Sequence, residues 1–485
     1  MSELICVFDV GTTGARTIII NGSGKVISKS YEEYPIVEQP TGISEQDPQI
    51  WWNAIKNTCN RAVKTINVND IIGISSTFLR GTITIVDKEG KVLYPALTWM
   101  DEREEHTAKE WTKEDDLRRI IPKILWIQKN RPALFEKTAK IIYPDTYIYM
   151  KLCDVYVTDP TNGVLGILNR NTLEWDEKLS ELYNLPLGLW PELHASGDVI
   201  GELNKNSAND LGLKKNTPII VGGGDQQCSS LGLGVINKGQ FKITVGTGTF
   251  VDGISDKPIQ PAGDFPIFSY PSVIKGNWNV EGLIPGTGTA FKWFKDNFSQ
   301  LQIKESLQKN IDVYDVLTQE ASHISAGSEG LLFIPLYMFK KGTIHGIGWN
   351  HTRAHMIRAI MESAALAAQV YLTIVEGMLG TKANEVKVDG GAMNSPLWTQ
   401  IFADVLSRKV LVPEVKDGAA MGAAILGFLG CKRYNRVENA IQEMIRFSEI
   451  KEPDKTNIKV YKKLNRIFMP TLLDIYSKKR VTKDL

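Results

Sequence analysis

A single carboxylate follows three consecutive glycines near the middle of the chain. Residues 219–221 are a β-branched run typical of a buried strand, and the glycines at 222–224 lead directly to Asp225. Because glycine carries no side chain, a ligand could approach the backbone of this stretch closely. A carboxylate held beside an alcohol can accept its proton, so Asp225 is a candidate general base. The structural alternative is that Asp225 only caps a helix formed by residues 227–235.

A turn rich in glycine and threonine follows this carboxylate. Residues 241–245 predict a strand that turns through Gly-Thr-Gly-Thr at 246–249. Such a turn exposes backbone N–H groups and hydroxyls that suit phosphate oxygens. Val-Gly-Thr-Thr at 10–13 echoes this pattern between two further predicted strands, which indicates two related domains that share a cleft. Coincidence is the alternative, because glycine and threonine are common in turns. Together with Asp225, the two turns indicate phosphoryl transfer to an alcohol.

Length and composition limit the classes of protein that the chain can belong to. Its 485 residues exceed one ordinary core, so two or three domains are expected. The balance of 56 basic and 55 acidic residues gives no sign of a nucleic-acid surface. We expect no membrane association, because no stretch approaches the ~20 apolar residues of a membrane span and the N-terminus lacks the basic lead of a signal peptide. Scattered cysteines without a CxxC pair argue against a zinc site and favour a reducing, cytoplasmic location.

The elements that must position these residues alternate between strands and helices, which predicts an α/β protein of two lobes. The expected strands are 4–8, 16–20, 25–29, 71–74, 82–86, 331–336 and 386–389. The expected helices are 48–66, 123–130, 145–152, 284–298, 354–379, 396–406 and 418–429. Residues 22–25, Gly-Ser-Gly-Lys, lack the remainder of a P-loop and lie between two strands, so we interpret them as a hairpin turn.

A series of motifs runs from about residue 5 to about residue 430. They are FDVGTTGAR (8–16), EQDPQIWW (45–52), TDPTNG (158–163), GGGDQQ (222–227), VGTGTF (245–250), DGGAMNSPLWTQIFADVL (389–406) and DGAAMGAAILG (417–427). In this order they resemble the FGGY family of carbohydrate kinases. The family's second signature fits residues 342–347 with 355–362, whereas the first fits only in its latter half, at 123–130. The resemblance implies a two-lobed actin-like, ribonuclease-H-like ATPase fold with the active site in the interlobe cleft. We expect a sugar-binding domain at 1–253, which holds the base and both hairpins, and a nucleotide-binding domain at 254–485.

The resemblance also implies roles for single residues. Asp225 matches the catalytic base, which agrees with the chemistry, because an alcohol is a poor nucleophile until its proton is accepted. Asp9 matches a carboxylate near Mg²⁺, with water between them. The glycines at the ATP-binding positions would admit the nucleotide close to the backbone, and their structural alternative is a tight entry into a helix. The positions that match ATP-binding residues are Thr12, Thr13, Arg16, Thr247, Gly288, Gly391 and Asn394.

The acceptor side departs from the better-known branches of the family. Glycerol kinases carry an Arg-Glu pair where this chain has Arg80-Gly81, and a tyrosine where it has Arg118. Loss of the carboxylate removes a glycerol ligand and leaves volume, which favours a larger acceptor. The Met-His-Gly usual in xylulokinases near residues 80–82 is also absent. Residues 222–227, 231–235 and 311–314 resemble the autoinducer-2 kinase branch instead.

We assign acceptor hydroxyls to Arg80 and Asp101, with Trp99 as an apolar wall and Gln226 and Phe250 as further acceptor residues. The structural alternative is an Arg80–Asp101 ion pair, which would contribute little to stability if partly exposed.

The expected function is ATP- and Mg²⁺-dependent phosphorylation of a terminal hydroxyl of a small-molecule sugar or polyol, with a ketopentose such as xylulose as the expected acceptor. Autoinducer-2-type and glycerol or other polyol kinases are alternatives, and a homodimer remains open. A phosphatase or an ATPase without an acceptor would need a positioned water molecule in place of a site that binds the acceptor alcohol. A non-catalytic sugar sensor would not need the assembled carboxylate and hairpins.

Overall fold

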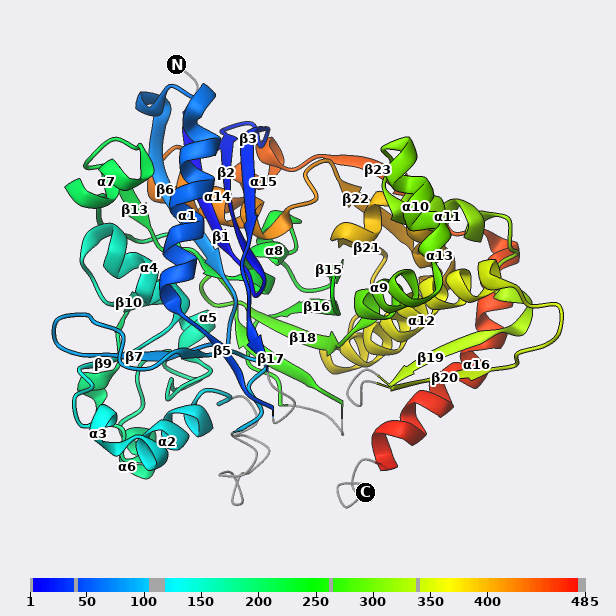
Figure 1. The fold of residues 1–485 in the computed structure, drawn as a ribbon, viewed down its shortest axis with the longest axis horizontal. Coiled ribbons are helices and arrows are strands. Elements are labelled where there is room, and N and C mark those ends of the chain that lie inside the picture. The colour runs from blue at the N-terminus through cyan, green and yellow to red at the C-terminus, as the bar shows by residue number, and fades with distance from the viewer. Residues whose placement is uncertain (1–2, 39–41, 104–117, 261–264, 337–340, 479–485) are drawn as a thin grey trace. The chain divides into compact units, whose positions relative to one another are not determined.

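The computed structural model describes residues 3–38, 42–103, 118–260, 265–336 and 341–478 (Figure 1). The chain forms two compact units. Unit 1 comprises Met1–Gly234, Tyr270–Trp278 and Asp417–Ile445, and unit 2 comprises Val235–Ser269, Asn279–Lys416 and Arg446–Leu485. The first boundary between the units therefore lies between residues 234 and 235, and not between residues 253 and 254. The reason is that the hairpin of residues 241–255 pairs with the second sheet, so the expected first domain was too long.

Unit 1 is built on a mixed sheet with the strand order β12-β13-β6-β1-β2-β3, to which β14 adds beside β6. β1 runs antiparallel to β2 and parallel to β6, which is parallel to β13 and β14. The bounds are β1 Leu4–Val10, β2 Gly14–Asn21, β3 Val26–Glu33, β6 Ile71–Phe78, β12 Val199–Glu202, β13 Pro218–Ile220 and β14 Gly223–Gly224.

Helices pack on both faces of this sheet. Alternate residues of β1 point to opposite faces. Phe8 belongs to the core beneath α1 (Pro48–Ala62) with Trp51, whereas Ile5 packs close to Gly427 of α14 (Gly418–Gly430). α14 packs against α8 (Asp225–Gly232), where both helices approach through glycine. A methyl group on Gly232 would lie 1.9 Å from the carbonyl oxygen of Gly418, so the Gly-rich sequence allows this close packing.

Unit 2 repeats the same plan. Its sheet has the order β17-β18-β16-β15-β21-β22-β23, in which β15 is antiparallel to β16 and parallel to β21, and β21 is parallel to β22. An antiparallel hairpin followed by parallel strands therefore occurs in both units. The bounds are β15 Phe241–Val245, β16 Thr249–Ser255, β17 Ile267–Pro271, β18 Trp278–Ile284, β21 Glu385–Asp389, β22 Lys409–Pro413 and β23 Phe447–Lys451.

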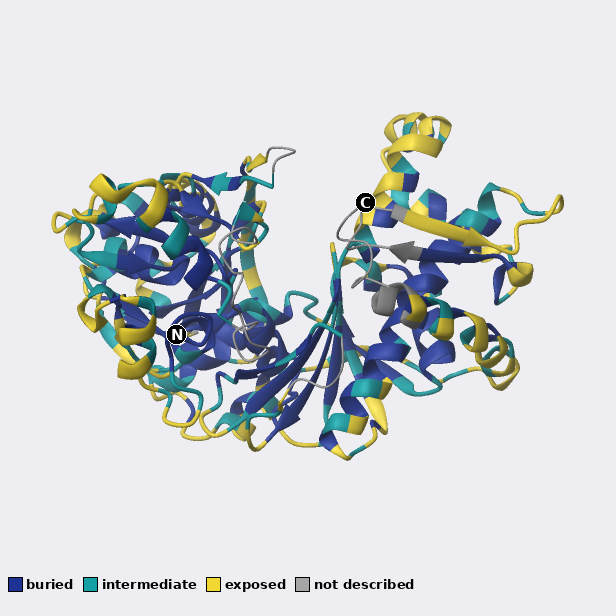
Figure 2. Ribbon diagram, turned by 90° about the horizontal axis from the view of Figure 1, so that it is seen from below, coloured by how far each residue is buried: buried dark blue, intermediate teal, exposed yellow. Residues whose placement is uncertain are grey.

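The core of unit 2 is organised around one long helix, α12 (Arg353–Leu379). A capping box between Thr352 and His355 begins it, and Gly380 ends it in the left-handed region, at φ 63°. Among the described residues α12 alone is long and apolar enough to cross a membrane, but 83% of its apolar window is buried inside the protein. Figure 2 shows buried residues, in dark blue, along the strands of the sheets. α12 is therefore the core helix of unit 2.

Further helices surround this core and reach the chain's end. They are α9 Thr287–Phe298, α11 Val313–Ser322, α13 Pro396–Leu406 and α16 Lys455–Lys478, of which the last contains Pro470. The expected helices at 123–130, 145–152 and 396–406 are present with shifts of at most two residues, as α2 Ile121–Asn130, α4 Pro144–Cys153 and α13. The expected helix at 48–66 ends earlier, at Ala62, where a 3-10 turn continues to Thr65.

Candidate active site

Asp225 is the first residue of α8, and its carboxylate is 39% exposed. Its Oδ1 accepts a hydrogen bond from the backbone N–H of Gln226 at 2.8 Å and lies 3.6 Å from Nε of Arg80. Within the described part of the chain, no hydrogen bond or ion pair engages its Oδ2. The N-cap position belongs to Gly224, and no side chain caps the helix. The capping interpretation of Asp225 is therefore wrong, and its carboxylate keeps an oxygen able to accept a proton.

The three glycines before Asp225 allow other segments of the protein to pack directly against their backbone. A methyl group on Gly222 would lie 1.5 Å from the carbonyl oxygen of Ser76 in β6, and one on Gly223 would lie 2.5 Å from Val273. One on Gly224 would lie 2.4 Å from Cδ of Arg80. The sequence led us to expect a ligand close to the backbone of these three glycines. That expectation is wrong, because protein atoms fill the space beside each of them.

Arg80 lies against this glycine segment, and its side chain is only 10% exposed. Its guanidinium carbon is 4.6 Å from the ring centre of Tyr270, a distance that permits a cation–π contact. Arg80 thus stands beside the carboxylate that would accept the proton. Nothing in the sequence pattern pointed to Tyr270, which is distant in sequence from both residues.

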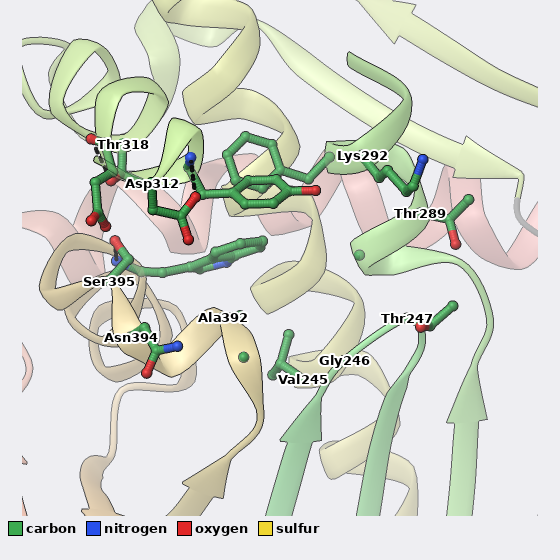
Figure 3. Close-up of a pocket in the computed structure, with 16 residues that line it drawn as sticks. Val245, Gly246, Thr247, Thr289, Lys292, Asp312, Thr318, Ala392, Asn394 and Ser395 are labelled. Atoms are coloured by element: carbon green, nitrogen blue, oxygen red, sulfur yellow. Dashed lines mark hydrogen bonds between the residues drawn. The ribbon is translucent and has the colours of Figure 1, made fainter. Parts of the chain in front are cut away.

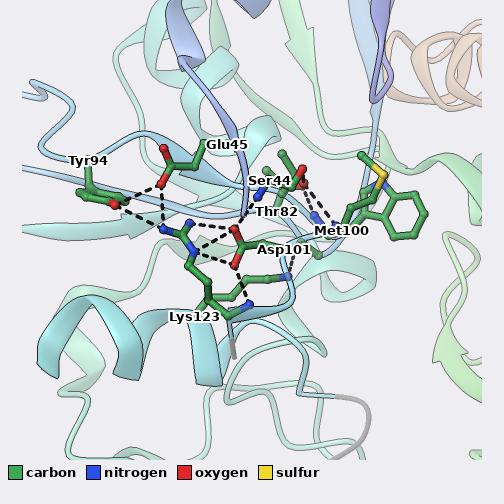
Figure 4. Close-up of polar contacts among 11 residues, drawn as sticks. Ser44, Glu45, Thr82, Tyr94, Met100, Asp101 and Lys123 are labelled. Atoms are coloured by element: carbon green, nitrogen blue, oxygen red, sulfur yellow. Dashed lines mark hydrogen bonds and ion pairs between the residues drawn. The ribbon is translucent and has the colours of Figure 1, made fainter. Parts of the chain in front are cut away.

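Asp101 belongs to a separate ion-pair network (Figure 4). Its carboxylate is buried and accepts from Nη2 of Arg103 at 2.7 Å and from the backbone N–H of Ser44 at 2.8 Å. Arg103 also pairs with Glu45 at 2.9 Å and lies over the ring of Trp126. The Arg80–Asp101 ion pair is therefore not formed. Asp101 therefore has a structural role, because it binds Arg103 and the strand that contains Ser44. Its assignment to an acceptor hydroxyl stays a prediction.

The first Gly/Thr hairpin is held by side chains from outside it. Gln46 donates to the carbonyl oxygen of Thr12 at 2.8 Å, and Tyr34 donates to that of Gly11 at 2.5 Å. The indole N–H of Trp99 donates to Oγ1 of Thr12 at 3.0 Å, so the expected acceptor wall touches the expected phosphate hairpin. Thr13, at the tip, is exposed.

A charged cluster lies at the base of this hairpin. Arg16 pairs with Asp417 at 2.5 Å and with Asp9 at 3.4 Å. Burial raises the pKa of Asp9 to about 6; Arg16 opposes that shift, and the charges of Asp417 and Asp225 add to it. Asp417 was missed, although its place directly before the Gly/Ala helix was visible in the sequence.

Unit 2 contains a pocket of about 410 Å³ (Figure 3). Such a volume falls within the ~300–1,000 Å³ range of small-molecule sites. One wall is aromatic, where the ring of Phe291 lies 5.3 Å from that of Tyr314 and 5.2 Å from that of Trp398. The polar lining comes from the second hairpin, α9, α11 and the loop after β21. It includes Gly246, Thr247, Thr289, Lys292, Asp312, Gly391 and Asn394.

The two glycines expected at the nucleotide differ in their surroundings. A methyl group on Gly288 would lie 2.2 Å from the carbonyl oxygen of Gly246, so this glycine joins α9 to the second hairpin. Around Gly391, in contrast, no described atom would lie within 4 Å of an added methyl group. Gly288 therefore forms the tight helix entry that was the structural alternative to nucleotide binding, and it also lines the pocket. Gly391 borders open space.

The structure brings the expected residues together in two groups. Asp9, Thr12, Thr13, Arg16, Arg80, Trp99, Asp101, Asp225 and Gln226 lie in unit 1, and Thr247, Phe250, Gly288, Gly391 and Asn394 lie in unit 2. The side chain of Asn394 accepts from Lys416 at 2.8 Å. Gln226 is buried and Phe250 is half-buried. Lys292, Asp312 and the aromatic wall were not anticipated, because single side chains on separate helices leave no spacing pattern.

Two units, each with a Gly/Thr hairpin between its first two strands and parallel strands beside that hairpin, define the two-domain actin-like ATPase fold. Family models place the chain within that class. Residues 4–232 match the N-terminal domain of the FGGY family of carbohydrate kinases, and residues 241–431 match its C-terminal domain. The chain therefore belongs to the FGGY family, and it is an ATP-dependent phosphotransferase.

Individual relatives carry several kinase names. The chain is 28% identical to a gluconokinase of Bacillus subtilis over 97% of its own length and 95% of the relative. It is 27% identical to a xylulose kinase of the same organism over 98% and 97% of the two chains. The crystal structure of a gluconate kinase from Lactobacillus acidophilus superposes with a TM-score of 0.86 at 21% identity, covering 98% and 99% of the two chains. At that identity the structural likeness shows the fold alone.

Proposed function

We propose that this kinase transfers the γ-phosphoryl group of ATP to a terminal hydroxyl of an open-chain sugar or polyol larger than glycerol. Asp225 accepts the proton of that hydroxyl. The observation that carries the proposal is the Asp225 carboxylate at the start of α8, which is accessible and has one oxygen without a hydrogen-bond partner among the described residues. A general base must present such an oxygen to the alcohol.

The pocket of unit 2 supports the nucleotide half of the proposal. It combines a Gly/Thr hairpin, Thr289 and Lys292 with an aromatic wall. Backbone N–H groups, hydroxyls and an ammonium suit phosphate oxygens, and an aromatic wall suits a purine base. Thr12, Thr13 and Arg16 supply the corresponding hairpin of unit 1.

The acceptor is proposed to be larger than glycerol because of Gly81. Its φ is +72°, and a methyl group there would lie 3.2 Å from Cβ of Trp99. Its carbonyl oxygen also accepts from the buried ammonium of Lys123 at 3.0 Å. A glutamate would be strained in this conformation. The chain thus lacks the carboxylate that glycerol kinases carry at the matching position, and a longer acceptor would use the space.

Xylulose is the first candidate acceptor and gluconate is the second. A five-carbon acceptor is compatible with the missing carboxylate at position 81, and a xylulose kinase is among the similar proteins. Gluconate enters because a curated gluconokinase and a gluconate kinase structure are among the similar proteins. Both are open-chain compounds with a terminal primary hydroxyl. Gluconate is negatively charged and xylulose is neutral, so assays with each compound distinguish the two candidates.

The residues near Asp9 fit a water-mediated Mg²⁺ ion. Asp417 and Asp225 add negative charge around Asp9, which a cation would relieve. No group of three carboxylate, histidine or cysteine ligands is close enough to cage a metal ion among the residues described. Mg²⁺ usually keeps several waters and takes one or two carboxylates, so a single nearby Asp9 suffices. The ion would neutralise phosphate charge, while Asp9 would orient its water shell.

The test is ADP release in a coupled assay with xylulose, gluconate, ribulose, glycerol and a no-acceptor control. We expect ADP release that depends on a five- or six-carbon acceptor. Glycerol as the best substrate would contradict the acceptor size. Equal ADP release without any acceptor would mean a bare ATPase. Binding of a sugar without ADP release would instead identify a sensor.

A further inference from the structure

Three side chains hold the backbone of residues 222–224 directly before Asp225. The hydroxyl of Tyr149 accepts from Gly222 N–H at 3.0 Å, and that of Thr77 donates to the Gly223 carbonyl at 3.1 Å. The hydroxyl of Thr161 accepts from Gly224 N–H at 2.8 Å. All three side chains are buried. The contact of Thr161 is the one nearest to Asp225, because Gly224 is the residue before it.

Thr161 is itself fixed by a buried polar chain. It lies in the short helix α5 (Pro160–Gly163), whose N-cap Asp159 accepts from the backbone N–H of Thr161 at 2.8 Å. The side-chain amide of Asn162 then donates to Asp159 at 3.3 Å and to Asp145 at 3.0 Å. Hydrogen bonds therefore run from Asp145 to the backbone of the residue that precedes Asp225.

The two carboxylates at the end of this chain lie deep in unit 1. Both are 1% exposed, and the described residues offer them no ion pair. Asp145 also accepts from Thr158 at 2.8 Å and from the backbone N–H of Thr146 at 2.6 Å. Burial raises the pKa of both carboxyl groups, and in Asp145 the charge of Asp159 adds to the shift. The pair thus exchanges a proton nearer to neutrality than ordinary carboxyl groups do.

Other titratable groups around the pair carry no positive charge. Tyr143 and Tyr149 face both carboxylates, which contribute to the raised pKa of each phenol. Cys228, in α8, feels the charge of Asp159 in the same way. When both carboxylates are ionised, only hydrogen bonds hold the two negative charges, which then repel each other across Asn162.

We infer that Asp145, Asn162, Asp159 and Thr161 form a support that positions Asp225, so that turnover depends on residues that touch neither nucleotide nor acceptor. The inference rests on the proposed role of Asp225. A carboxylate displaced by about 1 Å can lose on the order of 10²-fold in rate. The hydrogen bonds that Asp159 accepts from Thr161 and Asn162 favour its ionised form, so protonation of Asp159 would weaken the support and reduce kcat as pH falls through the range in which the pair takes up a proton.

The test compares Thr161→Val, which removes the hydroxyl at nearly constant shape, with Thr161→Ser, which keeps it. We expect Thr161→Val to lower kcat by roughly 10- to 100-fold with an unchanged ATP KM. Thr161→Ser should stay within about threefold of the parent, because its hydroxyl can still accept from Gly224. A parent-like kcat in Thr161→Val, or an equal loss in both variants, would overturn the inference.

Asp159→Asn keeps the N-cap oxygen but removes the charge, so it serves as a second variant. It should move the acid limb of the kcat–pH profile, because Asp159 no longer takes up a proton, and an unchanged profile would contradict the inference. Hydrogen exchange of a peptide covering residues 222–226 gives a readout without turnover. Exchange should be faster in Thr161→Val than in the parent and in Thr161→Ser, and equal exchange in all three would also overturn the inference. If the parent shows no acceptor-dependent ADP release, the proposed function fails, while this exchange comparison still decides whether Thr161 holds the loop.

Discussion

The glycines at 222–224 of unit 1 and Gly391 of unit 2 have opposite surroundings. Those at 222–224 of unit 1 have protein atoms within 1.5–2.5 Å of the position that a methyl group would take. At Gly391 of unit 2 the same space is open and borders the pocket. The glycines at 222–224 therefore bring protein segments close together, whereas Gly391 borders space that other protein atoms leave open. A glycine-rich motif alone does not tell these two uses apart.

The units also differ in their buried charge. The described carboxyl groups with a raised pKa are Asp9, Asp145 and Asp159, and all three lie in unit 1. In unit 2, the resolved shift of Asp296 is downward, caused first by the hydrogen bond from Lys292. Unit 1 therefore holds buried carboxyl groups with a raised pKa, while the pocket of unit 2 is lined mainly by neutral groups and an aromatic wall. Four predictions test this contrast.

The largest effect is expected from Asp225→Asn. Asparagine keeps the size of the side chain but cannot accept the alcohol's proton, so kcat should fall by roughly 10²–10⁴. The ATP KM should stay near that of the parent, because the pocket in unit 2 is unchanged. Steady-state ADP release measures both constants. Near-parental turnover in a folded variant would mean that the Asp225 carboxylate is not the base.

Arg80→Ala should have the next largest effect. Its guanidinium lies between Tyr270 and the Asp225 carboxylate, so its loss should lower kcat/KM for the acceptor by about 1–3 kcal/mol, which corresponds to roughly 5- to 150-fold. Arg80→Lys is the matched control, because it keeps the charge but loses the planar fork. A change in the ATP KM with unaltered acceptor kinetics would remove Arg80 from the acceptor side.

Gly391→Val should act on the nucleotide alone. The added side chain would enter open space at the pocket wall, so the protein should fold and the ATP KM should rise by roughly tenfold. Gly391→Ala is the control with a smaller intrusion and should show a smaller rise. Equal ATP affinity in the parent and the valine variant would place the nucleotide elsewhere.

The smallest effect concerns stability and pH. The pKa of Asp9 is raised in the folded protein, to about 6, above the value of about 4 for an unfolded chain. Between these values the folded state binds more protons at Asp9, so the contribution of this residue to stability should fall as pH rises from about 4 to about 6. The buried pair Asp145 and Asp159 adds in the same direction. Melting curves should show a decline of a few degrees, and Asp9→Asn should reduce the slope. An identical slope in Asp9→Asn would show that Asp9 is not perturbed.

Local sequence determined most of the elements and the order of the motifs. The β-branched runs at 4–8 and 219–221 and the apolar periodicity of 354–379 are sufficient for their strands and helix, because neighbours along the chain set these preferences. Asp225 and the two Gly/Thr hairpins were found in the same way. The echo of residues 10–13 and 245–248 indicated a duplicated plan, and both sheets do contain an antiparallel hairpin beside parallel strands.

Only the tertiary structure decided which side chains meet. Arg80 lies on Tyr270, which is distant in sequence. Asp101 pairs with its near neighbour Arg103 and not with Arg80, and Ser44 and Glu45 from a distant strand hold that pair. The boundary at 234/235 followed from the pairing of β15 with β21, which are more than 100 residues apart along the chain. Whether a glycine contacts protein or open space depends on what packs against it. Contacts between distant segments depend on the packing of whole elements, and residue type and spacing do not encode that packing locally.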